Sequence, residues 1–225
     1  MEIQKLQHTE NELQFLLKEI TPGLANMLRR IMIAEVPALA IEEVNFIKND
    51  SALYDEIVAH RLGLIPLKTD LSSYELKESC SCKGAGCAKC QLVLSLKAKG
   101  PCTVYSSEIQ SQDPKVKPVY SNMPITILQK TQKLEFEAVA ILGQGKQHAK
   151  FSPCLAYYTT ENDRDFMFFI ESFGQLTALE ILENAISVFD EKLNDFENGL
   201  KGEKGSKLDI LKKIPKPKLK LKKHY

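Results

Sequence analysis

Four cysteines lie within eleven residues of the sequence, in the stretch CSCKGAGCAKC. They are Cys80, Cys82, Cys87 and Cys90, with the spacing C-x-C-x4-C-x2-C. Four thiolates spaced in this way are typical of a tetrahedral Zn²⁺ site. Gly84 and Gly86 lie between the two pairs, where a tight reversal needs unusual φ values. An iron–sulfur cluster is less favoured, because its motifs usually place a ligand far away or before a proline.

A zinc ion held by four cysteines has no open position for water or substrate. We therefore expect a structural ion that holds the loop and supplies its folding energy, and we expect no catalytic residue. The stretch LGQGKQHAK at 142–150 lacks the arrangement of a phosphate-binding loop, so it predicts a turn between strands. Asp163 and Asp165 predict a solvated loop. His60 and Arg61 have no adjoining nucleophile, which favours structural or contact roles.

The composition is that of an ordinary globular chain, with 225 residues of which 44% are hydrophobic and 26% charged. No apolar run approaches the roughly 20 residues that cross a bilayer, and the first residues lack the apolar segment of a signal peptide. We expect a cytoplasmic protein without membrane contact. Its cysteines are then reduced, and clustered ones are ligands more often than disulfides.

The segment TPGLANMLRRIMIAEVP predicts a helix that Thr21 caps and in which Pro22 occupies the first turn. Strands are expected on either side, in ELQFLLKEI and in LAIEEVNFIKN. A short helix is expected within 51–70. The rest of the region from about 50 to 150 predicts a small β-rich unit that carries the cysteine loop.

A long helix is expected from Thr177, which forms a capping box with Glu180. Apolar residues then recur at alternating spacings of three and four. They are Leu179, Leu182, Ile186, Phe189, Leu193, Phe196 and Leu200. A helix of roughly 24 residues is about 36 Å long, more than a small domain covers. The apolar face either packs on the chain's own sheet or also meets a helix of another chain.

The last residues, 201–225, carry ten Lys against Glu203 and Asp209, a local balance of +8 that leaves −7 for residues 1–200. Such a tail can bind the phosphates of nucleic acid. Its prolines and lysines are equally compatible with a flexible end that only keeps the chain in solution.

Four segments in order point to a family: GLANMLRRIMIAEVPALAIEEV, LYDEIVAHRLGLIPLKTDL, LEFEAVAILGQGKQHAKFSP and FFIESFGQLTALEILENAI. Over residues 1–200 the chain resembles the D-type subunit of archaeal DNA-directed RNA polymerase. That type is the counterpart of the N-terminal domain of the bacterial α subunit and of the third-largest subunit of eukaryotic RNA polymerase II.

The resemblance implies an α+β fold with a discontinuous dimerisation domain, an antiparallel sheet with two long helices, at 1–48 and 152–200. A β-rich insert domain with the zinc loop at 80–90 occupies 49–151, and 201–225 is a basic tail. The implied partners are the smaller subunit L, subunits N and P, and the two large catalytic subunits. The residues assigned to the dimer interface are Leu24, Met27, Leu28, Ile31, Leu182, Ile186, Phe189, Leu193 and Phe196.

Arg29 and Arg30 match the LRR segment of the family, and with His60 and Arg61 they are assigned to contacts inside the assembly. Some archaeal members carry an extra iron–sulfur domain before the last helix. The sequence FSPCLAYYTTENDRDFMFFIES crosses that point directly, so no cluster is predicted. Two other hypotheses compete with a non-catalytic assembly subunit: a free-standing zinc-containing regulator that binds nucleic acid, and a metal-dependent hydrolase.

Overall fold

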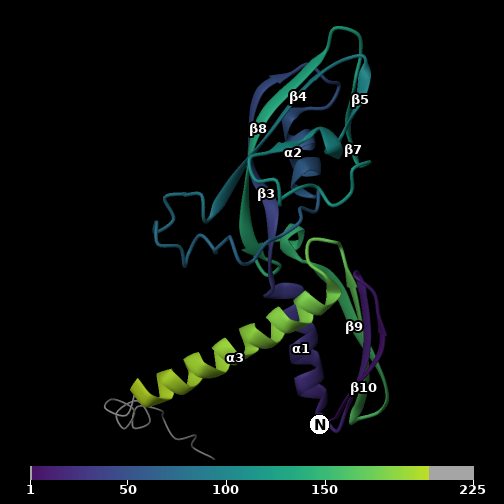
Figure 1. Ribbon diagram of the computed structural model, residues 1–225, viewed down its shortest axis with the longest axis vertical. Coiled ribbons are helices and arrows are strands. Elements are labelled where there is room, and N and C mark those ends of the chain that lie inside the picture. Colours follow the sequence, from purple (N-terminus) through teal and green to yellow (C-terminus); the bar gives the residue numbers. More distant parts are fainter. Residues whose placement is uncertain (1, 203–225) are drawn as a thin grey trace, which may run out of the picture. The chain divides into compact units, whose positions relative to one another are not determined.

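The computed structural model describes residues 2–202, which form antiparallel sheets and three helices and so confirm the predicted α+β class (Figure 1). The strands are β1 (Glu2–His8), β2 (Glu12–Lys18), β3 (Pro37–Asn49), β4 (Gln91–Lys99), β5 (Cys102–Tyr105), β6 (Gln110–Ser111), β7 (Pro124–Leu128), β8 (Lys133–Gln144), β9 (Cys154–Asn162) and β10 (Asp165–Ser172). The helices are α1 (Pro22–Ala34), α2 (Asp55–Gly63) and α3 (Ala178–Gly202), with 3-10 turns η1 (Ser106–Glu108) and η2 (Ala149–Phe151).

The first sheet has the strand order β1-β2-β10-β9, so it joins the first two strands of the chain to strands formed by residues 154–172. Successive side chains of a strand point to opposite faces, and in β2 every second residue, Leu13, Phe15 and Leu17, is buried. Phe15 stacks on Phe168 of β10 with ring centroids 5.1 Å apart. Helix α1 packs on this buried face of the sheet, where it contacts β9.

The predicted cap of α1 is confirmed, since Thr21 Oγ1 accepts a hydrogen bond of 3.3 Å from the Leu24 amide and Pro22 lies in the first turn. Pro has no N–H to leave unpaired there, and the hydroxyl satisfies one of the first free donors of the helix. The chain turns at Glu35 and enters β3 at Pro37.

The second sheet has the order β3-β8-β4-β6, and β5 pairs with β7 in a small sheet of its own. Strand β3 pairs with β8 along its whole length, from Pro37 opposite Gln144 to Asn49 opposite Leu134. The boundary predicted at 48/49 lies near the end of β3, all of which belongs to this second sheet; the division into two domains stays a prediction.

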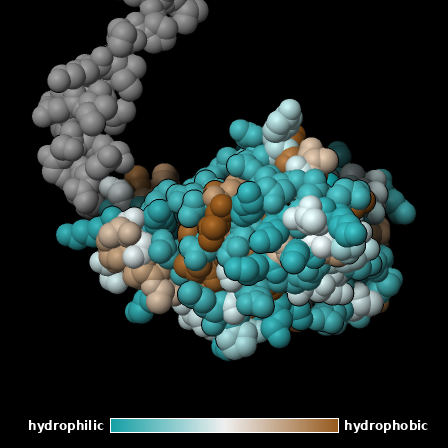
Figure 2. Space-filling view, turned by 90° about the horizontal axis from the view of Figure 1, so that it is seen from above, coloured by the Kyte–Doolittle hydropathy of each residue, from teal (hydrophilic) through white to brown (hydrophobic). Residues whose placement is uncertain are grey.

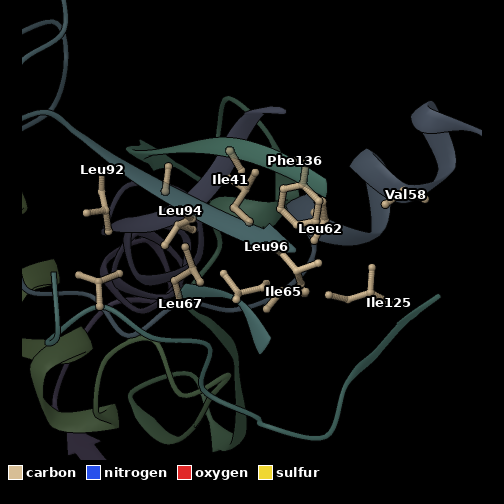
Figure 3. Close-up of a cluster of buried hydrophobic side chains, with 14 of the residues drawn as sticks. Ile41, Val58, Leu62, Ile65, Leu67, Leu92, Leu94, Leu96, Ile125 and Phe136 are labelled. Atoms are coloured by element: carbon tan, nitrogen blue, oxygen red, sulfur yellow. The ribbon is translucent and has the colours of Figure 1, made fainter. Parts of the chain in front are cut away.

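The core of the insert lies between this sheet and α2 (Figure 3). Leu92, Leu94 and Leu96 alternate along β4, and Val58 and Leu62 lie one turn apart on α2. Burial of one such aliphatic side chain stabilises the fold by roughly 1.5–3 kcal/mol. The cysteine loop leads directly into β4, so this core fixes where the loop ends.

Helix α3 begins with the predicted capping box. The Thr177 amide donates to Glu180 Oε2 at 2.8 Å and the Glu180 amide donates to Thr177 Oγ1 at 3.2 Å. The chain divides into compact units between Val188 and Phe189, within this helix. No helix within residues 2–202 is long and apolar enough to span a membrane.

Candidate functional site: a four-cysteine loop and exposed apolar helix faces

The four cysteine sulfur atoms lie together, all within 4.8 Å of one another. The Sγ atoms of Cys80 and Cys87 are 3.5 Å apart, those of Cys82 and Cys90 are also 3.5 Å apart, and those of Cys87 and Cys90 are 3.8 Å apart. A tetrahedral ion with Zn–S bonds of about 2.3 Å separates its sulfur ligands by about 3.8 Å. The donor set and its dimensions therefore fit a metal ion of this size.

The backbone of the loop reverses where the sequence predicted unusual φ angles. Gly84 and Gly86 have φ of +84° and +89°, and Lys83 between the cysteine pairs has φ of +53°. The C-x2-C half closes through the Cys87 amide, which donates to Cys90 Sγ at 3.3 Å. Glycine adopts these left-handed angles at little cost, so the spacing of the thiols follows from the sequence of the loop.

The thiols of the loop have unequal environments. A backbone hydrogen bond from Gly86 lowers the pKa of Cys82 to about 6. Burial raises the pKa of Cys90 to about 12, because an apolar environment disfavours the thiolate. A metal binds thiolates, so loading this cluster at neutral pH releases protons, mainly from the buried side.

Hydrogen bonds join two non-strand segments near the loop, one before it at 70–74 and one after β6 at 113–115. Tyr74 donates its hydroxyl to Asp113 Oδ2 at 2.8 Å, and Lys115 Nζ donates to Asp70 Oδ2 at 2.9 Å. Ser72 and Lys115 lower the pKa of Asp70 far below its usual value. The loop also pairs with the segment before it, through the Glu75 amide and the Lys89 carbonyl at 2.8 Å.

Tyr74 should make the stability of this region pH-dependent in alkali. Burial and the hydrogen bond to Asp113 raise the pKa of Tyr74 from 10.0 to about 12. A group whose pKa is raised on folding stabilises the native state below its unfolded pKa, so this contribution is lost as pH rises from 10 towards 12. Tyr74→Phe should show a smaller fall in unfolding free energy over that range, measured by urea titration. Tyr54→Phe, at a side chain 81% exposed, is the control and should leave the profile unchanged.

The apolar face predicted for α1 is only partly free. Leu24, Met27 and Leu28 are half-buried, whereas Ile31 is 4% exposed. Ile31 therefore belongs to the chain's own core with Ala25, where the helix packs on the first sheet. The other three residues remain available to a partner.

Helix α3 carries two apolar stripes rather than one. Its buried stripe is Ala178, Ile181 and Ala185, with spacings of three and four. The predicted stripe lies one residue further on, with Leu182 half-buried and Ile186 48% exposed. Because the chain's own core uses the first stripe, the second is left over.

The same predicted stripe continues in the second unit of the chain. There Phe189 is half-buried, and the side chains furthest along are exposed: Leu193 at 50%, Phe196 at 68% and Leu200 at 43%. Charged and uncharged polar residues, together with Gly199, fill the positions between them, as in a helix that pairs through one face.

The residues assigned to assembly contacts all reach the surface. Arg29 is half-buried and donates from Nε and Nη2 to Asn26 Oδ1, at 3.3 and 2.8 Å, while Arg30 is exposed. His60 and Arg61 are exposed on α2, where Arg61 Nη2 donates to the Pro124 carbonyl at 3.1 Å.

Sequence reasoning did not single out the outer side of α2 as a surface. Tyr54, Ile57 and Leu64 are 81%, 48% and 49% exposed there. Leu64 also lines a hollow of about 230 Å³, together with His60 and Lys150 among others. The sequence signal for this surface was the presence of apolar residues on more than one face of a short helix, since a single face is enough to pack on the core.

The loop after β8 caps the C-terminal end of α1, a role that its glycines did not reveal in the sequence. The Lys146 amide donates to the Ala34 carbonyl at 2.9 Å, and Gln144 Nε2 donates to the Glu35 carbonyl at 2.8 Å. Lys146 Nζ is 3.7 Å from the Glu35 carboxylate. The last carbonyls of a helix have no partner within it, so this loop both satisfies them and places a cation at the negative end. The predicted turn is confirmed.

Gly145 should be the least replaceable residue of that turn. A Cβ there would lie 2.3 Å from the Ile33 carbonyl oxygen and 3.1 Å from Ala34 Cα, both backbone atoms. Gly145→Ala should therefore cost about 2–3 kcal/mol of unfolding free energy, measured by denaturant titration. Gly23→Ala, near the other end of α1 with its nearest neighbouring atom 4.0 Å away, is the matched control. It should be neutral or stabilise by about 0.5–1 kcal/mol; equal losses for both would contradict this role for Gly145.

Comparison with known proteins shows which family the chain belongs to. Residues 41–153, half of the chain, match the family model described as the RNA polymerase Rpb3/RpoA insert domain. The chain is also 43% identical over 175 residues to DNA-directed RNA polymerase subunit Rpo3 of Methanocaldococcus jannaschii, covering 77% of this chain and 83% of that relative. The chain belongs to the Rpo3 family of DNA-directed RNA polymerase subunits.

Other relatives in the Rpo3 family are longer than the part that matches. The chain is 45% identical over 152 residues to Rpo3 of Archaeoglobus fulgidus and 46% identical over 158 residues to Rpo3 of Pyrococcus furiosus. These matches cover 68% and 70% of this chain but 58% of each relative. The family confirms the resemblance drawn from the sequence.

Proposed function

We propose that this chain is a non-catalytic assembly subunit of DNA-directed RNA polymerase, which pairs with a smaller subunit, subunit L, to form the platform for the large catalytic subunits. Family membership supports the polymerase role. The observation that carries the pairing is the second apolar stripe of α3, in which Ile186, Leu193 and Phe196 are about half exposed or more. Isolated globular chains bury such stripes, so a helix of another chain is the fitting cover.

The half-buried residues Leu24, Met27 and Leu28 of α1 extend the surface offered to subunit L. Truncation of a well-packed anchor in such an interface costs about 2 kcal/mol or more. Phe196 and Leu193 are the largest exposed candidates for this role.

A second surface, on the outer side of α2, is proposed for the large subunits. It combines exposed apolar residues, Tyr54, Ile57 and Leu64, with His60 and the cationic Arg61. Arg29 and Arg30 on α1 offer bidentate donors to carboxylates of a partner. Subunits N and P are expected beside this platform. In this proposal the large subunits catalyse nucleotidyl transfer, and this chain provides the surface on which they assemble.

The four-cysteine loop is proposed to hold one structural Zn²⁺. Its role is to fix residues 80–90, which are too few to form a core, against the start of β4. With four thiolates as ligands, no position is left for substrate, which disfavours a hydrolase. A role in binding nucleic acid depends on the basic tail at 201–225, of which residues 203–225 lie outside the described residues.

The test is to purify the full chain alone and mixed with subunit L, and to measure mass by light scattering and native mass spectrometry. A one-to-one complex is expected, followed by binding of subunits N and P and then the large subunits. If the chain stays a soluble monomer and does not bind subunit L, the proposal is wrong.

A further inference from the structure

The first sheet exposes an apolar strip on the side opposite to α1. We call this side the outer face; its strip consists of Leu16, Leu155, Tyr157, Met167 and Phe169. Strand register places them next to one another, with Met167 opposite Leu16 in β2 and Tyr157 opposite Phe169 across β9 and β10. The rings of Tyr157 and Phe169 stack with centroids 4.8 Å apart and an angle of 9°.

The strip exposes more apolar surface than is usual on the solvent-facing side of an antiparallel sheet. Leu155 is 50% exposed and Tyr157 is 48% exposed, and Phe173 just beyond β10 is 43% exposed. The solvent side of such a sheet is ordinarily polar. Figure 2 views the molecule from above, and on that side a few brown, hydrophobic side chains lie among mostly teal, hydrophilic ones. Contiguous exposed apolar area of this kind marks contact sites.

The charges around the strip are nearly all negative. Glu171 of β10 lies directly opposite Glu12 of β2, and both are exposed. Like charges directly opposite each other destabilise a sheet, so the free chain carries a repulsion at this end of the outer face. At the other end, Lys18 lies opposite Glu2. A hydrogen bond from Asn162 lowers the pKa of the nearby Asp165, and the charge of Lys18 adds a smaller contribution. Lys18 is the one cation among the outward strand positions whose side chains the structure describes.

We propose that the outer face is a docking surface for a basic segment of another polypeptide that carries apolar side chains between its lysines or arginines. Its apolar side chains cover Leu155, Tyr157 and Phe169, and one cation lies between Glu12 and Glu171. That cation removes the repulsion between the two carboxylates, and lysine or arginine stems pack well against stacked rings. The outer face of a second copy fits worse, because it brings the same acidic residues.

This surface is on the side of the sheet opposite to the α1 face proposed for subunit L. Helix α1 packs against the buried face of the sheet, through Ala25, Ile31 and Met32, so the two sides face different partners. The inference does not depend on the pairing role of α3.

The test uses the full chain and a fluorescently labelled peptide in which lysine and leucine alternate, with a glutamate–leucine peptide as its matched probe. Fluorescence anisotropy should detect binding of the lysine peptide alone, weakening as salt is added. Leu155→Ser with Tyr157→Ser should reduce the affinity at least about tenfold. Glu12→Gln with Glu171→Gln should reduce it by a similar factor and yet raise the melting temperature of the free chain. That opposite response separates a lost contact from a damaged fold.

Glu183→Gln with Glu56→Gln removes two exposed carboxylates elsewhere and should leave peptide affinity unchanged. Phe196→Asp should also bind the peptide normally, which keeps this result independent of pairing with subunit L. Equal binding of both peptides, or unchanged binding by the Glu12 and Glu171 variant, would overturn the proposal. Self-association that Leu155→Ser with Tyr157→Ser abolishes would assign the outer face to a second copy and overturn it as well.

Discussion

Phe196→Asp is expected to raise the dissociation constant for subunit L by at least about 100-fold, which corresponds to about 3 kcal/mol. The side chain is 68% exposed in the chain alone and lies on the second apolar stripe of α3. In a complex, the aspartate would have to leave water without a partner, and an unpaired buried carboxylate is among the costliest changes at an interface. Isothermal titration of the full chain with subunit L measures the change.

The control for this prediction is Asn194→Asp, which adds the same charge two positions earlier, off the apolar stripe. It should change the dissociation constant by less than about threefold, because rim charges contribute little to affinity. Both variants should keep the far-ultraviolet spectrum and melting temperature of the unmodified chain, since neither site is buried. If Phe196→Asp pairs as well as Asn194→Asp, the stripe is not the interface and the proposed platform role loses its main support.

Cys90→Ser is expected to bring bound zinc from about one ion per chain to near zero. Cys90 is 1% exposed, its sulfur lies 3.5 Å from Cys82 Sγ, and β4 begins at the next residue. A serine hydroxyl is a poor zinc ligand, so the three remaining thiolates hold the ion weakly. Residues near 78–92 should then exchange their amide hydrogens faster, and the chain should lose more than about 3 kcal/mol of stability, as expected when a structural metal is lost. Metal analysis of the purified protein and hydrogen exchange are the measurements.

Cys102→Ser is the matched control, because this half-buried thiol lies outside the cluster and donates to the Lys99 carbonyl at 3.6 Å. It should keep its zinc. Pairing with subunit L should survive Cys90→Ser, because the α1 and α3 faces lie elsewhere in the chain. Stoichiometric zinc in Cys90→Ser would contradict the four-cysteine site, and loss of pairing would show that the loop also supports assembly.

Several elements were readable because their signals are local. Thr21 and Pro22 start α1, and Thr177 with Glu180 starts α3, since capping depends on residues three apart. The first sheet was harder. The segment that forms β1 is mostly polar in sequence, so it was not predicted as a strand. In the structure it is an edge strand whose apolar residues, Ile3 and Leu6, are exposed. β9 and β10 were not assigned as strands, although they pair across a short turn.

The ligand set of the metal loop and the family of the chain could both be read from the amino-acid sequence. Each depends on residue types at fixed short spacings, which can be read without knowing how the rest of the chain packs. The tertiary structure was needed to show which apolar stripe of α3 is buried in the core and that Ile31 is buried. It was also needed to show that the backbone at the end of α1 leaves no room for a side chain at Gly145. Those properties depend on which segments meet across 100 residues or more, and side-chain spacing along one segment carries no information about what packs against it.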